Sequence, residues 1–538
     1  MKKKLFACLI ALASLTLTSC MSIFDLFNYS LDRYSNNGKI LSSVPAATTE
    51  LVANTGKYNF MDYIKNNVYA VSSAPSIGET HILVIPIWFT DSTSFIATSK
   101  KESVRKDIEN AYFGTNEETG WRSVKTYYEE ESHGALTITG TVSSWYEVGR
   151  RYSDYGVDYE TKNTIKLVED ATDWYFANNP TDKRTNYDKD KDGYLDGVMC
   201  IYAAPDNVSS KRDSYTNLWA YCFWIQEKSA KSVTKPGANA FFWASYDFMY
   251  SKDDSYARTA TSRFGSGDTT NCMIDAHTFI HEMGHMFGLD DYYDYSDYAY
   301  EPAGGFSMQD RNVGGHDAFS SFALGWGKAY TPNETVTINL KPFTDSGEMI
   351  LLSPNNDKSA VSPFDEYLLL EYYTPTGLNE FDVTHKYRNK GPVGSKESGI
   401  RLWHVDARLI YFSNIDYDVA YLTNDPTIKD GSVILAMTNS FPDGDKDHEG
   451  YLSPAGEDYY NFNMLQMIRN NPYVTYKPES GNGLRDANLF KKGESFRMVD
   501  FPKQFVNPGK LNDGSDLGYA FQVNDTNEEF ASITVIKL

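Results

Sequence analysis

The sequence is poor in basic residues and has no long apolar segment beyond its N-terminus. It holds 50 Lys and Arg against 72 Asp and Glu, a formal net charge of -22. Nucleic acids and anionic membrane surfaces are bound through basic patches, so this charge argues against both as partners. No later run is long and apolar enough to cross a bilayer, and internal repeats and low-complexity tracts are also missing. The acidic balance is compatible with an exported protein that binds divalent cations.

The N-terminus has the pattern of an export signal. Three lysines precede an apolar run from Leu5 to Leu17, which is about the length of a signal-peptide core. The run ends in Leu17-Thr-Ser-Cys20, which resembles a bacterial lipobox. We therefore predict a lipoprotein signal peptide at 1–19 and lipidation of Cys20, which would anchor the chain in the membrane as a cell-surface lipoprotein of a bacterium. The alternative is an ordinary signal peptide, with the protein secreted.

Cysteine is scarce, with five in 538 residues. If Cys8 leaves with the signal peptide and Cys20 is lipidated, three cysteines remain, Cys200, Cys222 and Cys272. An odd set allows one disulfide and one buried thiol, but the spacing does not say which two would pair.

Histidine is also scarce, with nine in the chain, yet two of them form His281-Glu282-x-x-His285. On a helix, positions i and i+4 lie on one face, so both imidazoles can reach one ion. Glu282 can then act on a water at that ion without being a ligand. Gly288 permits the left-handed turn that ends a helix, and the returning chain brings Asp291 to the same ion. Two imidazoles, one carboxylate and an open position are the ligand set of a catalytic zinc ion.

Other interpretations of this stretch stay open. The third ligand is predicted to be Asp291, with Asp290, Asp294 and Glu301 as alternatives nearby. His277 lies one turn before His281, but only three protein ligands are needed, so we expect it to pack against the next element or to hydrogen-bond a ligand. An amphipathic helix with two histidines at its polar edge is the structural alternative.

A second candidate metal site is the acidic loop at 186–197. Carboxylates stand at positions 1, 3, 5 and 9 of a calcium-loop pattern, with glycine at position 6 and a backbone carbonyl at position 7. These residues are Asp188, Asp190, Asp192, Asp196, Gly193 and Tyr194. Position 12 is Met199 rather than glutamate, and a strand follows, so an EF-hand is excluded. A single calcium-stabilised turn and a solvated acidic loop remain.

Strands and helices alternate before the zinc motif. We predict strands at 81–91, 136–142 and 198–203 and helices at 103–113, 123–134 and 161–178, from apolar runs, helical spacing and glycine stops. Asp317 is predicted to cap a further helix. Later apolar runs at 432–437 and 531–536 are separated by Gly, Asn and Asp turns, which indicates strands. The pattern favours an α/β (α+β) domain followed by a β-rich module.

The chain resembles the immune inhibitor A family of secreted bacterial zinc metallopeptidases. The resemblance is carried by 281–294, with Gly-Leu-x-Asp-x-Tyr-Asp after the second histidine, and by segments at 88–91, 123–134, 186–197, 323–326, 366–371 and 399–406. Met308, after Gly304-Gly305-Phe306-Ser307, matches a methionine turn beneath the metal. The resemblance implies a metzincin-like catalytic domain, endopeptidase activity on proteins, one catalytic Zn²⁺ and structural Ca²⁺.

These observations give one predicted organisation. After the signal peptide we expect a tether or pro-like segment at 20–76, a zinc metalloprotease catalytic domain at 77–345 and a β-rich region at 346–538, of which 346–410 is still family-like. The predicted function is a monomeric zinc metalloendopeptidase that cuts extracellular proteins or peptides, with Glu282 as general base and acid. The alternatives are a catalytically weak cell-surface binding protein and a zinc hydrolase of a non-peptide substrate.

Overall fold

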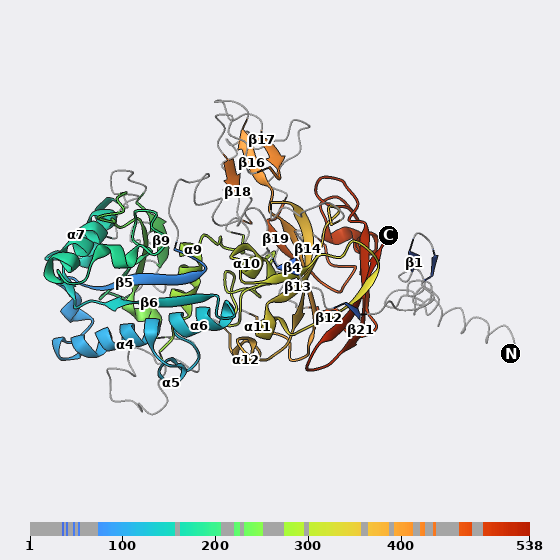
Figure 1. Cartoon of the computed structure of the whole chain (residues 1–538). Helices are drawn as coiled ribbons and strands as arrows, with labels where there is room; N and C mark the ends of the chain where they lie inside the picture. The colour runs from blue at the N-terminus through green and yellow to red at the C-terminus, as the bar shows by residue number, and fades with distance from the viewer. Residues whose placement is uncertain are drawn as a thin grey trace, which may run out of the picture.

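The computed structural model describes four short strands before residue 54 and most of the chain from residue 74 onward. The described ranges are 35–36, 39–40, 47–48, 52–53, 74–155, 162–205, 220–225, 231–250, 274–294, 301–356, 364–386, 392–412, 420–425, 434–436, 439, 462–475 and 488–538. The predicted signal peptide, Cys20 and Cys272 lie outside them. An α/β part and a β-rich part lie side by side, with α9 and α10 between them (Figure 1).

A mostly parallel sheet forms the centre of the α/β part. Its order is β6-β5-β8-β10-β9, and only β9, at the edge, runs antiparallel to its neighbour. The strands are β5 (Gly78–Trp88), β6 (Leu136–Val142), β8 (Val198–Tyr202), β9 (Tyr221–Trp224) and β10 (Ala240–Ser245), with the short β7 (Tyr146–Glu147) beside β5. β8 and β10 are buried along their whole length, as expected for parallel strands covered on both faces. The three strands predicted in this part are confirmed.

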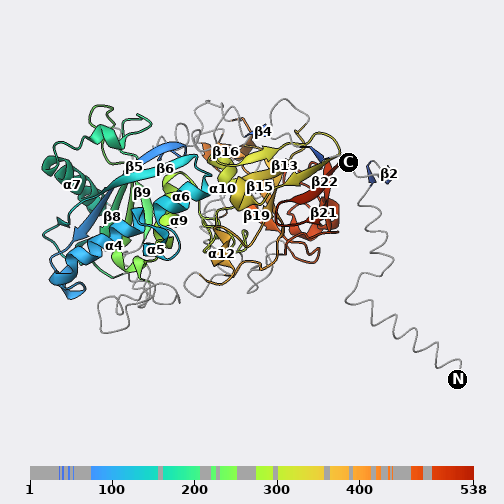
Figure 2. The ribbon, with the colours of Figure 1, turned by 60° about the horizontal axis from the view of Figure 1, so that its bottom comes forward.

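Helices cover both faces of this sheet. Ile82 and Val84 of β5 belong to the core shared with α4 (Lys101–Phe113), α6 (Val124–Glu131) and α9 (His277–Met286). Leu83 and Ile85 point to the other face, which is covered by α7 (Lys162–Asn178). Figures 1 and 2 show α7 on one side of the sheet and α4 with α6 on the other. The three predicted helices are therefore confirmed, and a single turn, α5 (Asn116–Thr119), follows α4.

Two further sheets face each other in the β-rich part. One has the order β19-β15-β14-β13-β11-β4 and the other β20-β21-β22-β12-β3, and a second apolar core lies between them. The first contains β19 (Leu465–Ile468), β15 (Gly399–Asp406), β14 (Glu366–Tyr373), β13 (Glu348–Leu352), β11 (Lys328–Tyr330) and β4 (Val52–Ala53). The second contains β20 (Ser495–Arg497), β21 (Tyr519–Thr526), β22 (Ala531–Lys537), β12 (Val336–Leu340) and β3 (Ala47–Thr48). This arrangement is a sandwich of two sheets.

The apolar core of the α/β part continues into this sandwich. Tyr367 and Leu369 of β14 and Trp403 of β15 lie in the same core as Ile82 and Met308. The short helices α10 (Ala318–Ala323), α11 (Phe343–Ser346) and α12 (Asn379–Asp382) lie at this junction, and Asp317 caps α10 as predicted by accepting a hydrogen bond from the Ser320 amide. The predicted boundary at residue 345 stays a prediction, although β11 and β12 precede it and already belong to the sandwich sheets.

The remaining described strands are short. β16 (Leu409–Phe412) pairs with β17 (Ala420–Thr423) and β18 (Ile434–Ala436), and β1 (Ser35–Asn36) pairs with β2 (Lys39–Ile40). From the predicted 20–76 segment, β3 pairs with β12 and β4 with β11. None of the helices in the described ranges is both long and apolar enough to cross a membrane.

Candidate metal centre

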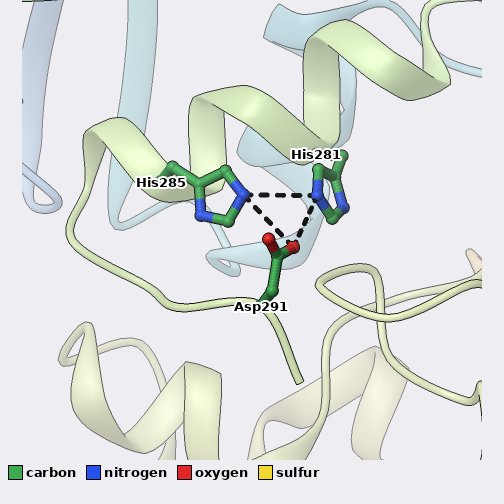
Figure 3. Close-up of side chains that lie close together, drawn as sticks. All are labelled: His281, His285 and Asp291. Atoms are coloured by element: carbon green, nitrogen blue, oxygen red, sulfur yellow. Dashed lines mark hydrogen bonds and ion pairs between the residues drawn. The ribbon is translucent and has the colours of Figure 1, made fainter. Parts of the chain in front are cut away.

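Helix α9 presents the motif and ends where the sequence predicts. The left-handed residue is Gly288, with φ +102°. The Leu289 amide donates to the Gly284 carbonyl at 3.1 Å and the Gly288 amide to the His285 carbonyl at 2.8 Å. These two bonds form a Schellman motif, which closes the helix and reverses the chain. The reversal carries Asp291 back beneath the helix (Figure 3).

Three donor atoms converge below α9. His281 Nε2 lies 3.3 Å from His285 Nε2, and Asp291 Oδ1 lies 3.0 Å and 3.4 Å from these two nitrogens (Figure 3). Ligands held in a tetrahedron at zinc's usual distances lie roughly 3.3 Å from one another. The three separations therefore fit one face of a zinc tetrahedron, and the carboxylate is 6% exposed.

The hydrogen bonds of the Nδ1 atoms fix the orientation and the tautomer of both imidazoles. His281 Nδ1 lies 2.8 Å from the Met308 carbonyl oxygen and His285 Nδ1 lies 2.8 Å from the Leu289 carbonyl oxygen. A carbonyl oxygen can only accept, so each Nδ1 carries the proton and donates it. In its neutral form, each ring then directs the lone pair of Nε2 at the common point. Two lone pairs and a carboxylate oxygen at one point are suited to a cation.

The ionisable groups are strongly coupled. Burial alone would lower the pKa of His285, but the Asp291 carboxylate raises it to about 10. His281 shows the same balance, since Asp291 outweighs burial and raises its pKa. The two rings in turn hold the pKa of Asp291 below its ordinary value in spite of burial. The Asp291 carboxylate thus supplies the negative charge that balances either protons on the two rings or a cation bound between them.

Glu282 sits beside this centre without joining the ligand group. It is 7% exposed, and its carboxylate accepts a hydrogen bond from the Cys222 backbone amide of β9. Burial raises the pKa of Glu282, while His285 and His281 oppose the rise. A raised pKa makes a carboxylate a stronger base, which suits a group that takes up a proton during a reaction.

The remaining candidates for the third ligand lie elsewhere. The three-residue group at the centre contains neither Asp290, Asp294 nor Glu301, and Glu301 forms an ion pair with Arg311 at 2.9 Å. His277 lies outside the three-residue group, and its Nε2 is 2.6 Å from the Asn312 carbonyl oxygen, so its expected role in packing or in hydrogen bonding to a ligand stays a prediction. The structure thus brings His281, His285 and Asp291 together, and their role as ligands stays a prediction.

Some residues around the methionine turn lie near the centre although no sequence pattern predicted them. Met308 is fully buried, and its backbone carbonyl contacts His281. The Gln309 amide group lies 3.4 Å from His285 Nδ1 and 3.2 Å from His316 Nε2, and His316 Nδ1 is 2.9 Å from the Tyr127 hydroxyl. His316 has no ligand spacing in the sequence, so no local signal identifies it.

The acidic loop brings together part of its predicted set. Asp188, Asp190 and Asp196 place oxygens within 4.8 Å of one another, whereas Asp192 instead accepts a hydrogen bond from the Tyr194 amide. Burial raises the pKa of Asp188 to about 6 and that of Asp196 to about 8, and neighbouring carboxylates add to both shifts. Asp188 Oδ1 is buried without a hydrogen-bond partner. A cation would relieve this arrangement, so the three residues fit Ca²⁺.

Cys200 and Cys222 are free thiols. They lie on β8 and β9, on opposite sides of β10. The disulfide that the cysteine count allowed is therefore absent between these two.

Comparison with known proteins now identifies the region. Residues 81–309 match the family model of the immune inhibitor A peptidase M6 catalytic domain. The predicted resemblance to the immune inhibitor A family is confirmed. Immune inhibitor A of Bacillus thuringiensis subsp. alesti is 26% identical over 193 residues, which is 32% of this chain and 25% of that protein. Pre-pro-metalloprotease PrtV of Vibrio cholerae serotype O1 (strain M66-2) is 24% identical over 206 residues, or 35% of this chain and 20% of that protein.

The peptidase M6 region, residues 81–309, contains every candidate ligand described above. It also contains Glu282 and Met308. The chain aligns with only a quarter and a fifth of the lengths of these two relatives. Helix α10 and all strands of the sandwich sheets lie outside the peptidase M6 region: β3 and β4 precede it, and the other strands follow it.

Proposed function

We propose that this chain is a zinc metalloendopeptidase that hydrolyses peptide bonds of proteins outside the cell. The observation that supports this most directly is the convergence of His281, His285 and Asp291 within 3.4 Å, with the buried Glu282 carboxylate beside them. A match to a peptidase catalytic domain over the same residues agrees with it.

The donor set favours zinc. Two imidazole nitrogens and one carboxylate oxygen suit this ion, and a fourth position is left for water or substrate. His281, His285 and Asp291 would hold the zinc ion, which when bound would supply the Lewis acidity that polarises a carbonyl group and makes water acidic enough to ionise near neutral pH. The Met308 and Leu289 carbonyls keep the two rings oriented for this role.

Glu282 is the group we assign to proton transfer. Its carboxylate accepts the proton of the attacking water and then delivers it to the leaving amide nitrogen. Burial raises its pKa, which strengthens the carboxylate as the base of the first step. An intact Glu282 also counts against the alternative of a binding protein, because binding alone needs no general base.

Strand β9 is the surface we propose for the substrate backbone. Among the described strands it pairs only with β10. The Ile225 amide donates to the Asn239 carbonyl, so by the alternation of antiparallel pairs the backbone groups of Cys222 face away from β10. The Cys222 amide reaches Glu282 on that side. An extended peptide added along this edge would lie next to the general base.

The remaining parts of the proposal concern calcium and location. The acidic triad Asp188, Asp190 and Asp196 is proposed to hold one structural Ca²⁺. Export and lipid attachment at Cys20 rest on the N-terminal sequence pattern. We further propose that the protein is a monomer.

The test compares wild type with Glu282→Gln. We expect the wild type to bind one zinc per chain and to cleave casein, and we expect a chelator to abolish the cleavage. Glu282→Gln should retain zinc and lose activity by a factor on the order of 10² to 10⁴, the usual contribution of a general base. Metal content is measured by elemental analysis on the same samples.

Two results would overturn the proposal. A wild-type protein without stoichiometric transition metal removes the zinc enzyme altogether. A zinc-loaded wild type that cleaves no protein, but hydrolyses ester or acetyl-sugar probes in a Glu282-dependent manner, points to the non-peptide hydrolase instead.

A further inference from the structure

The sandwich sheet carries a buried ion pair on the face that meets the peptidase M6 region. Glu371 of β14 and Arg401 of β15 are directly opposed across the antiparallel pair, and the Arg401 guanidinium lies 3.0 Å from the Glu371 carboxylate. Both side chains are at most 2% exposed. Side chains alternate along a strand, so Glu371 faces the same way as Tyr367 and Leu369, toward the core that holds Met308.

Each member of the pair contacts the chain that follows the zinc motif. Glu371 Oε2 accepts a hydrogen bond at 2.8 Å from the Ala318 amide, at the start of α10. Arg401 Nη1 donates to the Phe306 carbonyl oxygen at 3.4 Å, and its guanidinium carbon lies 4.4 Å from the centre of the Tyr373 ring. The pair therefore fixes two backbone positions: Phe306, which begins the 306–308 turn that contains Met308, and Ala318, which follows this turn at the start of α10.

A second contact ties the turn to the helix start. The Ser307 hydroxyl donates to Asp317 Oδ2 at 2.6 Å, and Asp317 caps α10. Phe306, Ser307 and Ala318 are thus all fixed by hydrogen bonds. Ser307 is followed by Met308, whose carbonyl orients the His281 ring. The route from the sandwich to the centre runs from Glu371 and Arg401, through the backbone of Phe306 and the turn, to His281.

We propose that Glu371 and Arg401 are positioning residues of the metal centre, contributed by the sandwich sheet. Their role is to hold the 306–308 turn in the position where the Met308 carbonyl accepts a hydrogen bond from His281 Nδ1. This inference rests on the proposed zinc site. It makes the β-rich module part of the metal centre's support, although the module lies outside the peptidase M6 region. Groups that hydrogen-bond a metal ligand directly typically change metal affinity by about 10- to 100-fold when replaced, and this pair acts one step further out, so the lower end of that range applies.

The experiment measures metal binding rather than turnover alone. Glu371→Gln keeps the size of the side chain but removes its charge, and Arg401→Met removes the guanidinium. The matched control is Glu366→Gln on the same strand, because Glu366 is also buried but faces the opposite side, where it contacts His404 at 2.8 Å and the Asn512 amide. The zinc dissociation constant of the full chain is measured by competition with a chromogenic chelator, and the visible spectrum of the Co²⁺-loaded protein reports ligand geometry.

We expect Glu371→Gln and Arg401→Met to raise the zinc dissociation constant about tenfold and to alter the Co²⁺ spectrum. Glu366→Gln should leave both unchanged even if it lowers the unfolding temperature. A folded Glu371→Gln with wild-type zinc affinity and Co²⁺ spectrum overturns the inference alone, since the wild type still binds zinc and cleaves protein. If the single variants do not fold, Glu371→Leu with Arg401→Met removes both charges together, and wild-type zinc affinity in that folded double variant overturns the inference equally. A wild type that binds no zinc overturns the proposed function, and this inference with it.

Discussion

The carbonyl oxygen of Met308 lies 2.8 Å from Nδ1 of His281. The residue that the sequence marks as a methionine turn thus meets the metal centre through its backbone, which any residue at that position retains. The buried side chain fills the core below the centre. Orientation of the ring and filling of the core are therefore separate tasks of one residue.

Met308→Leu should consequently preserve most of the activity. Leucine has a similar volume and keeps the backbone carbonyl, so we expect a loss of stability below about 1.5 kcal/mol and a change in kcat/KM of no more than a few fold. Kinetics with a fluorogenic peptide and thermal unfolding measure the two effects. A loss of a hundredfold or more in zinc affinity would instead show that the thioether itself supports the centre.

Gly288→Ala should disturb the metal centre through the backbone. Gly288 has φ +102°, a conformation that costs an L-residue about 1–2 kcal/mol. Because Asp291 reaches the centre through this turn, we expect weaker zinc binding as well as lower stability. Gly134→Ala is the control, since Gly134 has φ +77° and lies away from the centre, with open space where the alanine methyl group would project. It should lose stability but keep the zinc affinity of the wild type.

Asp291→Asn tests the identity of the third ligand. The amide keeps the shape of the carboxylate but lacks its charge, so zinc affinity should fall by more than the roughly 10- to 100-fold typical of outer-shell changes. Asp290→Asn, one residue away and outside the three-residue group, should change it little. Isothermal titration with Zn²⁺ compares the two variants. Equal affinities would reject Asp291 as a ligand.

Calcium should stabilise the acidic loop. At a concentration 100 times its dissociation constant, a ligand that binds only the folded state adds about 2.7 kcal/mol. We expect the unfolding temperature to rise with Ca²⁺ in the wild type and Asp192→Asn, but not in Asp196→Asn, because Asp192 lies outside the triad. Calorimetry with and without Ca²⁺ measures the rise. No rise in the wild type would favour a solvated acidic loop.

Asp382 should make stability depend on pH. Its side chain is fully buried, and burial raises its pKa to about 7, although the charge of Arg401 opposes the shift. The unfolded carboxyl ionises near pH 4, so this residue destabilises the fold by roughly 1.4 kcal/mol per pH unit as the pH rises from about 4 to 7, and no further above that. Asp382→Asn removes the titration. Its unfolding temperature relative to wild type should therefore increase between pH 4.5 and 7.5.

The control for this pH effect is Asp345→Asn, which changes an exposed carboxylate on α11. Its difference from wild type should be the same at both pH values. A pH-independent difference for Asp382→Asn as well would mean that the Asp382 carboxyl titrates in the fold as it does in the unfolded chain.

The sequence by itself determined the local geometry of the centre. Helical spacing places His281 and His285 on one face, and Gly288 ends the helix because glycine adopts the left-handed conformation that a Schellman motif requires. The strand at 136–142 and the helices near 101–113 and 162–178 also followed from periodicity. Each of these features depends on residues within a few positions of one another, so the sequence alone specifies them.

Only the tertiary structure decided which distant groups support the centre. Asp290, Asp291, Asp294 and Glu301 were all near enough in sequence to be ligands, and the path of the chain after the turn placed only Asp291 beside both rings. The opposition of Glu371 and Arg401 depends on strand register, and a shift of either strand by one residue would turn its side chain to the other face and separate the pair. Register is set by packing of the whole sheet rather than by neighbouring residues, so these contacts cannot be derived from sequence patterns.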